Sequence, residues 1–330
     1  MKSAVIPVFI PHLGCPNDCI FCNQRRIAAP KVPDVSDVRG IIESALEYTK
    51  LPQISFYGGS FTCIDESLQE RYLSAAYEYV RAGRADSLRV STRPDGIDGN
   101  VLARLKKYGV KTIELGAQSM DDRVLLLARR GHTAEDVRTA SKMIKQAGFE
   151  LVLQIMPGLP GADARADMQT AREIAALKPD AVRIYPVCVI KDTALCDMYE
   201  RGEYIALTPE TAAELCADIW EIFIEEQIPV IRIGLNPTEE LSDGAAVAGA
   251  YHPAMGQLVR SERLYKKAVQ KLDALLPFEN ALITVPRGKL SDMRGQKNAN
   301  AAKLRERYPG SLIEIKERQD QKEEIFIAKI

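Results

Sequence analysis

Six short runs of β-branched and aromatic residues alternate with amphipathic stretches along most of the chain. Such runs, bounded by turn residues, predict buried strands at 4–10, 54–58, 88–92, 111–115, 150–155 and 181–185. Helical periodicity predicts helices at 36–49, 66–82, 99–108, 134–147, 164–176 and 209–226. Because βα units in series favour a parallel sheet with right-handed crossovers, we expect an α/β fold. The pattern predicts a partial (β/α)6 TIM-like barrel over residues 1–233.

The sequence changes character after residue 233. A stretch rich in Gly, Ala and Pro leads into a predicted helix at 258–275, which is followed by strand-like runs at 281–285, 312–317 and 325–330. Another helical stretch separates the first two of these runs. We therefore predict a small C-terminal α/β domain over residues 234–330, which is a candidate for binding substrate or RNA.

Composition limits the location and the partners of the chain. Its 330 residues are 46% hydrophobic, which is enough to fill a large core, and a net charge of −1 gives no overall attraction to nucleic acid. The amino-terminal segment has one Lys, and Pro7 and Pro11 break its apolar run. It therefore fits neither a signal peptide nor a membrane span, and we expect a cytoplasmic protein without a membrane partner.

Three of the seven cysteines, Cys15, Cys19 and Cys22, form a CxxxCxxC motif directly after the first predicted strand. Three thiolates leave one iron of a 4Fe-4S cluster open, and an open iron can chelate the amino and carboxylate groups of S-adenosylmethionine (SAM). A zinc site is an alternative that would need a fourth ligand, either His12 or a distant Cys. A disulfide is a further alternative, although the odd number of cysteines favours reduced thiols and a metal site.

The cysteine motif, with Phe21 before its last Cys, resembles that of the radical SAM superfamily. The resemblance implies that a reduced donor such as flavodoxin or ferredoxin supplies one electron, which the cluster passes to SAM. SAM then splits into methionine and a 5′-deoxyadenosyl radical that abstracts hydrogen from a substrate. The protein would supply the ligands, the orientation of the reacting bond and a dry cavity.

Gly58 and Gly59 follow the second predicted strand. Paired glycines allow a close approach of the backbone to a ligand, although such pairs are also common in simple turns. Their place one βα unit after the cysteines resembles the Gly-Gly-Glu-like motif of the superfamily, which binds the methionine amino group of SAM.

Further segments over roughly residues 1–230 resemble the radical SAM part of the Elongator catalytic subunit. They are Ser91–Asp95, Glu114–Ser119, Arg129–Thr133, Ala147–Phe149, Met156–Gly161, Ile184–Val187 and Met198–Tyr204. Oxygen-independent coproporphyrinogen oxidase is a more distant relative by the GxQS and GLPG elements. The resemblance implies that Gln118 contacts the adenosyl ribose or the substrate side and that Arg130 pairs with the SAM carboxylate. The alternative for either residue is a solvated or loop-capping side chain.

Three features differ from these families. Thr92 stands where the porphyrinogen enzymes have a glutamate, so the ribose contact would pass to Asp95 or Glu114. The cysteine spacing is shorter than in the Elongator subunit, and the chain ends without an acetyltransferase domain, so acetyl transfer to tRNA uridine is not implied.

The resemblance makes tRNA or other RNA a candidate substrate, and a basic segment adds weak support. Between Arg287 and Arg307 the cations are Arg287, Lys289, Arg294, Lys297, Lys303, Arg305 and Arg307, against Asp292 and Glu306. Such a segment can bind phosphates, or it can be the solvated face of an amphipathic helix.

Two further side chains have open roles. Cys188 can face the barrel cavity as a hydrogen-atom donor or lie buried as a small apolar residue. His252 can belong to a lid over the substrate or bond within its own loop, and His132 is expected to fix a loop.

Three functional hypotheses follow. The first is a radical SAM enzyme that abstracts hydrogen from RNA. The second is a radical SAM enzyme acting on a small metabolite or a tetrapyrrole-like acid. The third is a non-catalytic protein that uses an iron-sulfur cluster for binding or sensing.

Overall fold

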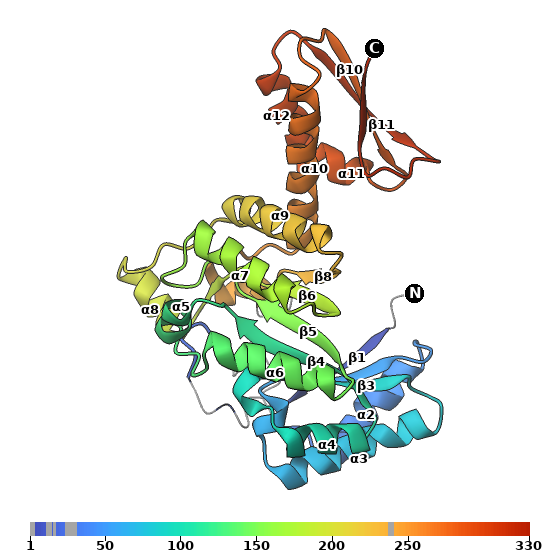
Figure 1. The fold of residues 1–330 in the computed structure, drawn as a ribbon, viewed down its shortest axis with the longest axis vertical. Helices are drawn as coiled ribbons and strands as arrows, with labels where there is room; N and C mark the ends of the chain where they lie inside the picture. Colours follow the sequence, from blue (N-terminus) through green and yellow to red (C-terminus); the bar gives the residue numbers. More distant parts are fainter. Residues whose placement is uncertain (1–3, 11–14, 16–17, 24–31, 237–240) are drawn as a thin grey trace.

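The computed structural model describes residues 4–10, 15, 18–23, 32–236 and 241–330. Its main element is a seven-stranded parallel sheet in the order β1-β2-β3-β4-β5-β6-β8 (Figure 1). The strands are β1 (Val5–Ile10), β2 (Gln53–Gly58), β3 (Ser87–Thr92), β4 (Val110–Gln118), β5 (Glu150–Ile155), β6 (Ala181–Ile184) and β8 (Val230–Ile233). The predicted α/β half-barrel is thus confirmed, with one strand more than the six expected.

Helices cover the outer face of this sheet. They are α2 (Val35–Leu46), α3 (Glu66–Arg81), α4 (Gly99–Lys107), α6 (Ala134–Gln146), α7 (Ala164–Ala176) and α9 (Pro209–Glu225). Two further helices, α5 (Asp122–Leu127) and α8 (Ala194–Glu200), pack instead in a separate small core. Asp or Thr side chains cap the amino termini of these helices, and Thr133 with Asp136 forms the expected capping box of α6. The short elements α5, α8, β7 (Cys188–Ile190) and β9 (Ala246–Gly249) are not among the predicted ones, because they are too short to show a period.

The two faces of the curved sheet differ in polarity. On β2, Ile54 and Phe56 are buried in the main hydrophobic core, whereas the alternate residues Gln53 and Tyr57 point to the concave side. The order of strands ends at β1 and β8, so the barrel stays open between these two edges. An open barrel leaves the concave side available for polar side chains and ligands.

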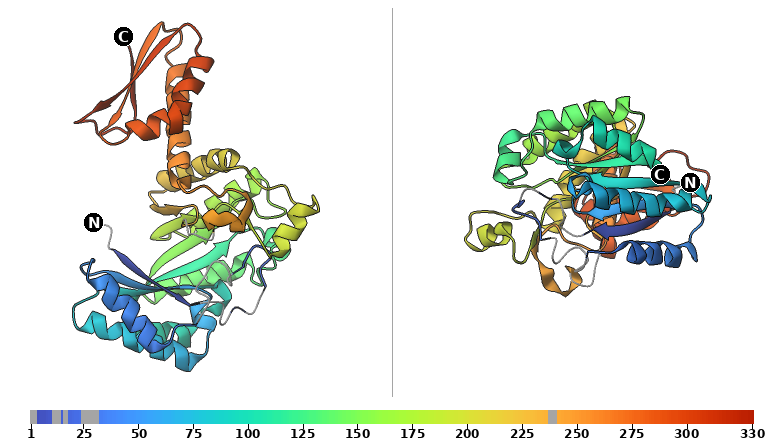
Figure 2. Two further views of the ribbon diagram at one scale, coloured as in Figure 1. Left: turned by 180° about the vertical axis from the view of Figure 1, so that it is seen from behind. Right: turned by 90° about the horizontal axis from the view of Figure 1, so that it is seen from below.

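The C-terminal part extends from the half-barrel along the long helix α10 (Met255–Asp273), and Figure 2 shows it from behind. It contains α11 (Leu290–Arg294), α12 (Ala299–Arg307) and a three-stranded sheet in the order β11-β10-β12. In this sheet β10 (Asn280–Pro286) lies parallel to β11 (Leu312–Arg318) and antiparallel to β12 (Phe326–Lys329).

Helix α10 is shared by two hydrophobic cores. Met255 and Val259 belong to the core of the half-barrel, whereas Leu264, Ala268 and Leu272 belong to the core of the C-terminal sheet. The two cores therefore divide within this helix, further along the chain than residue 234. Within the described ranges, no helix is both long and apolar enough to cross a membrane.

Candidate active site

A cavity of about 300 Å³ lies at the carboxyl ends of the strands. This edge is where parallel α/β sheets place their reactive groups. All eight residues predicted to hold the cluster or SAM line this cavity: Cys15, Cys19, Phe21, Cys22, Gly58, Gly59, Gln118 and Arg130. They come from four separate segments of the chain, which the curved sheet brings together.

The cysteine segment is anchored to two distant loops. The Ile20 N–H donates to the Ala128 carbonyl oxygen at 3.2 Å, and the Leu195 N–H donates to the Ile20 carbonyl oxygen at 2.8 Å. The Cys22 N–H donates to the Cys19 carbonyl oxygen at 3.0 Å, so these two cysteines share one turn. The backbone thus holds the thiols at the cavity wall.

The described residues contain no group of three or more His, Cys, Asp or Glu side chains that could hold a metal ion. A cubane cluster makes a different demand, since each of its thiolates binds a separate iron atom. Cys15, Cys19 and Cys22 all line the same cavity. His12, the proposed fourth zinc ligand, lies outside the described residues.

Gly58 brings the end of β2 against the end of β1. Its φ of +110° is a conformation that L side chains rarely adopt, and an added Cβ would lie 2.3 Å from the Ile10 carbonyl oxygen. The Gly59 N–H donates to that same oxygen at 2.9 Å. Since β1 leads directly into the cysteine segment, the glycine pair fixes where that segment begins.

Arg130 lies beside the thiols. Its Nη1 donates to the Cys19 sulfur at 3.5 Å, and its Nη2 donates to the Gly116 carbonyl oxygen at 2.9 Å. An added Cβ on Gly116 would lie 2.7 Å from that Nη2, so the close approach depends on glycine. The guanidinium therefore places a positive charge where thiolates and a ligand carboxylate would gather.

A second guanidinium, that of Arg93, has no role that the sequence predicts, although it lies within one of the motifs. Its side chain is 1% exposed, donates to the Arg130 carbonyl oxygen at 2.6 Å and pairs with Asp95 at 2.9 Å. Burial alone would lower the pKa of Arg93, but the hydrogen bond with Asp95 and the nearby Cys19 and Cys15 thiolates raise it above its usual value. Arg93 thus adds a permanent charge behind the cysteines.

Neither Asp95 nor Glu114, the two carboxylates proposed for the ribose contact, lines the cavity, whereas Thr92 does. The Thr92 hydroxyl lies 2.5 Å from that of Thr62. Asp95 is engaged with Arg93, and Glu114 lies in a network on the concave face. The arrangement leaves Thr92, rather than either carboxylate, at the cavity wall.

Gln118 occupies a strained position at the end of β4. Its φ is +68°, and the pairing with β5 shifts register between Gly116 and Gln118. The Gln118 side-chain oxygen accepts a hydrogen bond from Gln154 Nε2 at 3.2 Å. The irregularity turns the Gln118 amide into the cavity, where it can bond a ligand.

His132 supports this strand end. Its Nε2 lies 3.1 Å from the Ala117 carbonyl oxygen, and the ring is buried. Burial, and then the positive charge of Arg130, lower the pKa of His132 to about 4. The ring is therefore neutral near pH 7 and fixes the loop, in the structural role expected for it.

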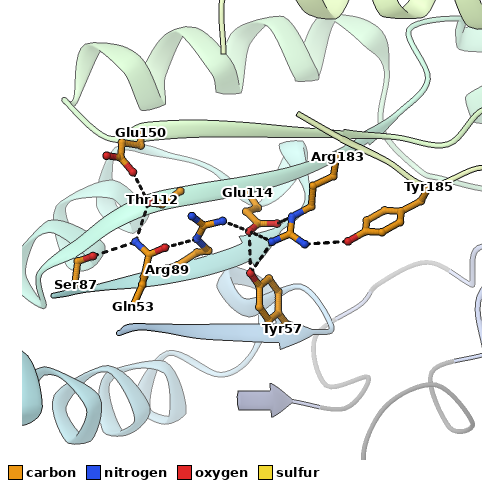
Figure 3. Close-up of polar contacts among 9 residues, drawn as sticks. All are labelled: Gln53, Tyr57, Ser87, Arg89, Thr112, Glu114, Glu150, Arg183 and Tyr185. Atoms are coloured by element: carbon orange, nitrogen blue, oxygen red, sulfur yellow. Dashed lines mark hydrogen bonds and ion pairs between the residues drawn. The ribbon is translucent and has the colours of Figure 1, made fainter. Parts of the chain in front are cut away.

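A charged network lies on the concave face below the cavity (Figure 3). Glu114 accepts from Arg89 at 2.5 Å, from Tyr57 at 3.0 Å and pairs with Arg183 at 2.9 Å. Arg183 also donates to the Tyr185 hydroxyl at 3.0 Å, and Tyr185 lines the cavity. Burial, and then the charge of Glu114, raise the pKa of Tyr57 to about 12, so its phenol stays protonated.

Other residues of the cavity lining were given no ligand role by the sequence. They are Gln154, Met156, Tyr185, Pro186, Cys188, Ile190 and Leu235, of which Met156, Tyr185 and Pro186 lie in segments that resemble the Elongator subunit. Cys188 is buried and faces the cavity, and burial raises the pKa of its thiol to about 12. The thiol is thus buried and also reaches the cavity wall.

Neither His252 nor the basic segment 287–307 lines the cavity. The His252 Nδ1 accepts a hydrogen bond from the Ala254 N–H at 3.0 Å. In the basic segment, Lys303 pairs with Glu262 at 3.1 Å and Arg307 with Asp273 at 2.9 Å. Part of the charge of that segment is thus neutralised within the C-terminal part.

Comparisons with known proteins cover most of the chain. The model of the Radical SAM superfamily matches residues 9–174, and the model of the Radical_SAM C-terminal domain matches residues 179–265. A tRNA uridine(34) acetyltransferase of Methanocaldococcus jannaschii is 31% identical over 183 residues, which cover 49% of this chain and 34% of that protein. An uncharacterized protein of the same organism is 32% identical over 268 residues, which cover 76% of this chain and 80% of that protein.

A solved structure of an archaeal Elp3 from Methanocaldococcus infernus, with an amino-terminal deletion, is also similar. It superposes with a TM-score of 0.63 and 25% identity over 82% of this chain and 63% of that chain. The chain thus spans about a third of the length of the acetyltransferase that it matches, and most of the length of the uncharacterized protein.

Proposed function

Because the chain belongs to the radical SAM superfamily, and is an enzyme of that superfamily, we propose that Cys15, Cys19 and Cys22 hold a 4Fe-4S cluster beside a SAM site. The observation that carries the proposal is that these thiols line one cavity with Gly58, Gln118 and Arg130. The bound cluster and SAM together supply a 5′-deoxyadenosyl radical for hydrogen abstraction. The family membership also removes the alternative of a non-catalytic sensing protein.

Three groups of the chain would orient SAM. Backbone carbonyl groups at Gly58 and Gly59 accept hydrogen bonds from its ammonium group, because the missing side chains allow a close approach. The Arg130 guanidinium pairs with its carboxylate, and the Gln118 amide bonds its ribose or the substrate side. Phe21 covers the cysteine segment at the cavity wall.

Apolar side chains of the cavity lining would protect the radical. Met156, Pro186, Ile190 and Leu235 line the cavity and exclude water from the reacting atoms. The Cys188 thiol, whose raised pKa keeps its proton near neutral pH, belongs to the same lining. None of these five side chains carries a charge that would compete for the ligand, so positioning depends on the polar groups at the cysteine side.

We further propose that the substrate is RNA and that a reduced flavodoxin or ferredoxin supplies the electron. The support for RNA is the similarity to tRNA uridine(34) acetyltransferases over the radical SAM region. These relatives are much longer than the matched region, so acetyl transfer is not part of the proposal.

The cofactor proposal is tested by anaerobic reconstitution. We expect the protein to bind about four iron and four sulfide and to form 5′-deoxyadenosine when dithionite and SAM are added. Ser substitutions at Cys15, Cys19 or Cys22 should each abolish that product. The matched control is Cys196→Ser, since Cys196 lies in α8 outside the cavity lining and a hydroxyl can keep its bond to Glu200. Stoichiometric zinc without iron and sulfide would overturn the proposal.

The substrate proposal needs a separate assay. Deuterated total RNA and a deuterated metabolite extract are offered to the reduced enzyme, and label is followed into 5′-deoxyadenosine. Transfer from RNA supports the proposal. Transfer only from the metabolite extract would assign the enzyme to a small-molecule substrate instead.

A further inference from the structure

A second, larger hollow lies where the half-barrel meets the C-terminal part. This cleft of about 900 Å³ is lined by β8, by the first turns of α10 and by the segment around α11. Resting on the proposed function, we infer that the cleft binds the phosphodiester backbone of the RNA substrate next to the residue that enters the cavity. We call this hollow the junction cleft.

The charges of the junction cleft favour an anion. Four cations line it, Arg232, Arg260, Arg263 and Lys289, against the carboxylates of Asp292 and Glu324. Asp292 is shared, because it lies 3.2 Å from Arg260 Nε and 3.6 Å from Lys289 Nζ. Two cations with one carboxylate leave a net positive charge, as phosphate binding requires.

Among the residues that the structure describes, Arg232 is bonded to backbone carbonyl groups rather than to a carboxylate. Its Nε and Nη2 donate to the carbonyl oxygens of Gly234 and Leu235, each at 2.9 Å. Carbonyl groups hold the guanidinium in place but do not cancel its charge, so it remains attractive to an anion.

A helix begins at the same point, although the Ala254 N–H already donates to His252 Nδ1 and the Gln257 N–H to the Ala254 carbonyl oxygen, so the helix dipole is its main contribution. Ala254, Gly256 and Gln257 line the cleft and belong to the amino-terminal end of the 19-residue helix α10, which has no side-chain cap. A Cβ on Gly256 would lie 3.7 Å from Arg260 Nη1, so the guanidinium lies directly over this helix end. The dipole of a helix favours an anion at its amino terminus.

Arg263 lies at the cleft, but its charge is already balanced by two carboxylates. Its side chain is 6% exposed, and its Nε has no hydrogen-bond partner within the described structure. Its Nη1 pairs with Glu221 at 2.7 Å, its Nη2 pairs with Glu324, and its guanidinium lies 5.2 Å from the Trp220 ring centroid. Because the Arg263 Nε is fully buried, an anion in the cleft would meet the Arg232, Arg260 and Lys289 side chains rather than this atom.

The cleft adjoins the catalytic cavity, which favours a polymer over a small anion. Arg232 lines the cleft and donates to the carbonyl oxygen of Leu235, and Leu235 lines the cavity. A polymer with one residue in the cavity can place a neighbouring phosphate beside Arg232, Arg260 and Lys289. A small metabolite held in the cavity has no second anion to place there.

The test measures binding of total tRNA to the full, iron-loaded chain by fluorescence anisotropy from about 50 to about 200 mM salt. The double variant Arg260→Gln and Lys289→Gln removes two cleft charges. We expect its Kd to rise about tenfold or more and its salt slope to become shallower by about one for each phosphate that is no longer bound. Its control, Lys142→Gln with Arg165→Gln, removes the same two charge types from exposed positions on α6 and α7.

A second variant guards against misfolding of the first. Ser291 is exposed at the cleft, and no side-chain hydrogen bond of Ser291 is present among the described residues, so Ser291→Glu adds a negative charge without breaking an existing bond. We expect it to weaken tRNA binding several-fold. Ser291→Gln, of the same size but neutral, should bind like wild type.

The outcomes separate this inference from the proposed function. Weaker binding by both cleft variants, with wild-type affinity in both controls, supports the junction cleft. Equal affinity of the cleft variants and the controls overturns it, while hydrogen abstraction from RNA by the wild type would still stand. Formation of 5′-deoxyadenosine by a wild type that binds neither tRNA nor other RNA overturns both the cleft and the RNA substrate, but not the radical chemistry.

Discussion

The Arg130 guanidinium lies 3.5 Å from the Cys19 sulfur, although 111 positions separate the two residues in the chain. The same side chain reaches the Gly116 carbonyl oxygen on β4. Arg130 therefore connects the cysteine segment to the centre of the sheet. Its charge can serve a cysteine thiolate, a SAM carboxylate, or both.

Substitution of Arg130 separates these roles. We expect Arg130→Gln to lower SAM affinity by roughly ten- to hundredfold, because a charge-assisted hydrogen bond contributes about 1.5–3 kcal/mol. Arg130→Lys should retain part of the affinity, since it keeps the charge but loses the forked geometry. Equilibrium binding of SAM to iron-loaded protein measures this. Wild-type SAM affinity together with reduced iron content would show that Arg130 acts on Cys19 alone.

Gly58 offers a second test, based on stability. Gly58→Ala should destabilise the fold by about 1–3 kcal/mol, because its φ is left-handed and the new Cβ meets the Ile10 backbone at 2.3 Å. The control is Gly40→Ala within α2, where nothing lies within 4 Å and Ala should stabilise the helix by roughly 0.5–1 kcal/mol. Urea unfolding of both variants checks the signs. Equal effects of the two substitutions would contradict the strain at Gly58.

The sequence predicted the elements with a clear period. The six predicted strands and six of the predicted helices lie within a few residues of β1 to β6 and of α2, α3, α4, α6, α7 and α9. Membership of the radical SAM superfamily and the similarity to the Elongator catalytic subunit, both expected from the cysteines and later motifs, are confirmed. Local patterns sufficed there because each motif follows a strand, and the fold gathers the ends of parallel strands.

The sequence did not predict features that depend on how the strands are arranged in space. Strand β8 is a four-residue run, as short as β6, and the six predicted strands did not include it. Arg93 resembles an ordinary surface cation in the sequence, and only its burial behind the cysteines shows its place in the site. Arg89, Glu114 and Arg183 stand on three different strands, so their pairing requires the curvature of the sheet.

The network of Glu114 makes a strong prediction about stability. Its carboxylate is 3% exposed and faces two guanidinium groups, so Glu114→Gln leaves buried positive charge unpaired. We expect a loss of about 3–5 kcal/mol, as for other broken buried ion pairs. The control is Glu43→Gln, whose pair with Arg84 is half exposed, and it should leave the unfolding midpoint unchanged. A small effect at Glu114 would indicate that water reaches the concave face.

Two buried groups should give opposite pH dependences of stability in the same range. The pKa of His132 is lowered to about 4, so the unfolded chain binds a proton there more readily, and stability falls as the pH drops from 6.5 to 4. Burial raises the pKa of Asp167 to about 7, so the folded chain holds that proton more readily, and stability rises as the pH drops from 7 to 3.8. The two contributions, each of order 3 kcal/mol, oppose each other in the wild type.

Single substitutions should reveal the pH dependence of stability that each group contributes. His132→Gln removes the first titration, so relative to wild type its free energy of unfolding should rise as the pH drops from about 7 to about 5. In the wild type, Asp167 accepts a hydrogen bond from the Gly158 N–H at 2.9 Å, and the Asp167→Asn variant keeps an oxygen for this bond. Relative to wild type, the free energy of unfolding of this variant should fall as the pH drops from about 7 to about 5. Urea unfolding of samples with matched iron content measures both. The two variants should differ from wild type with opposite signs only if, in the folded state, His132 is neutral and Asp167 is protonated. Differences of the same sign would therefore contradict one of these two protonation states.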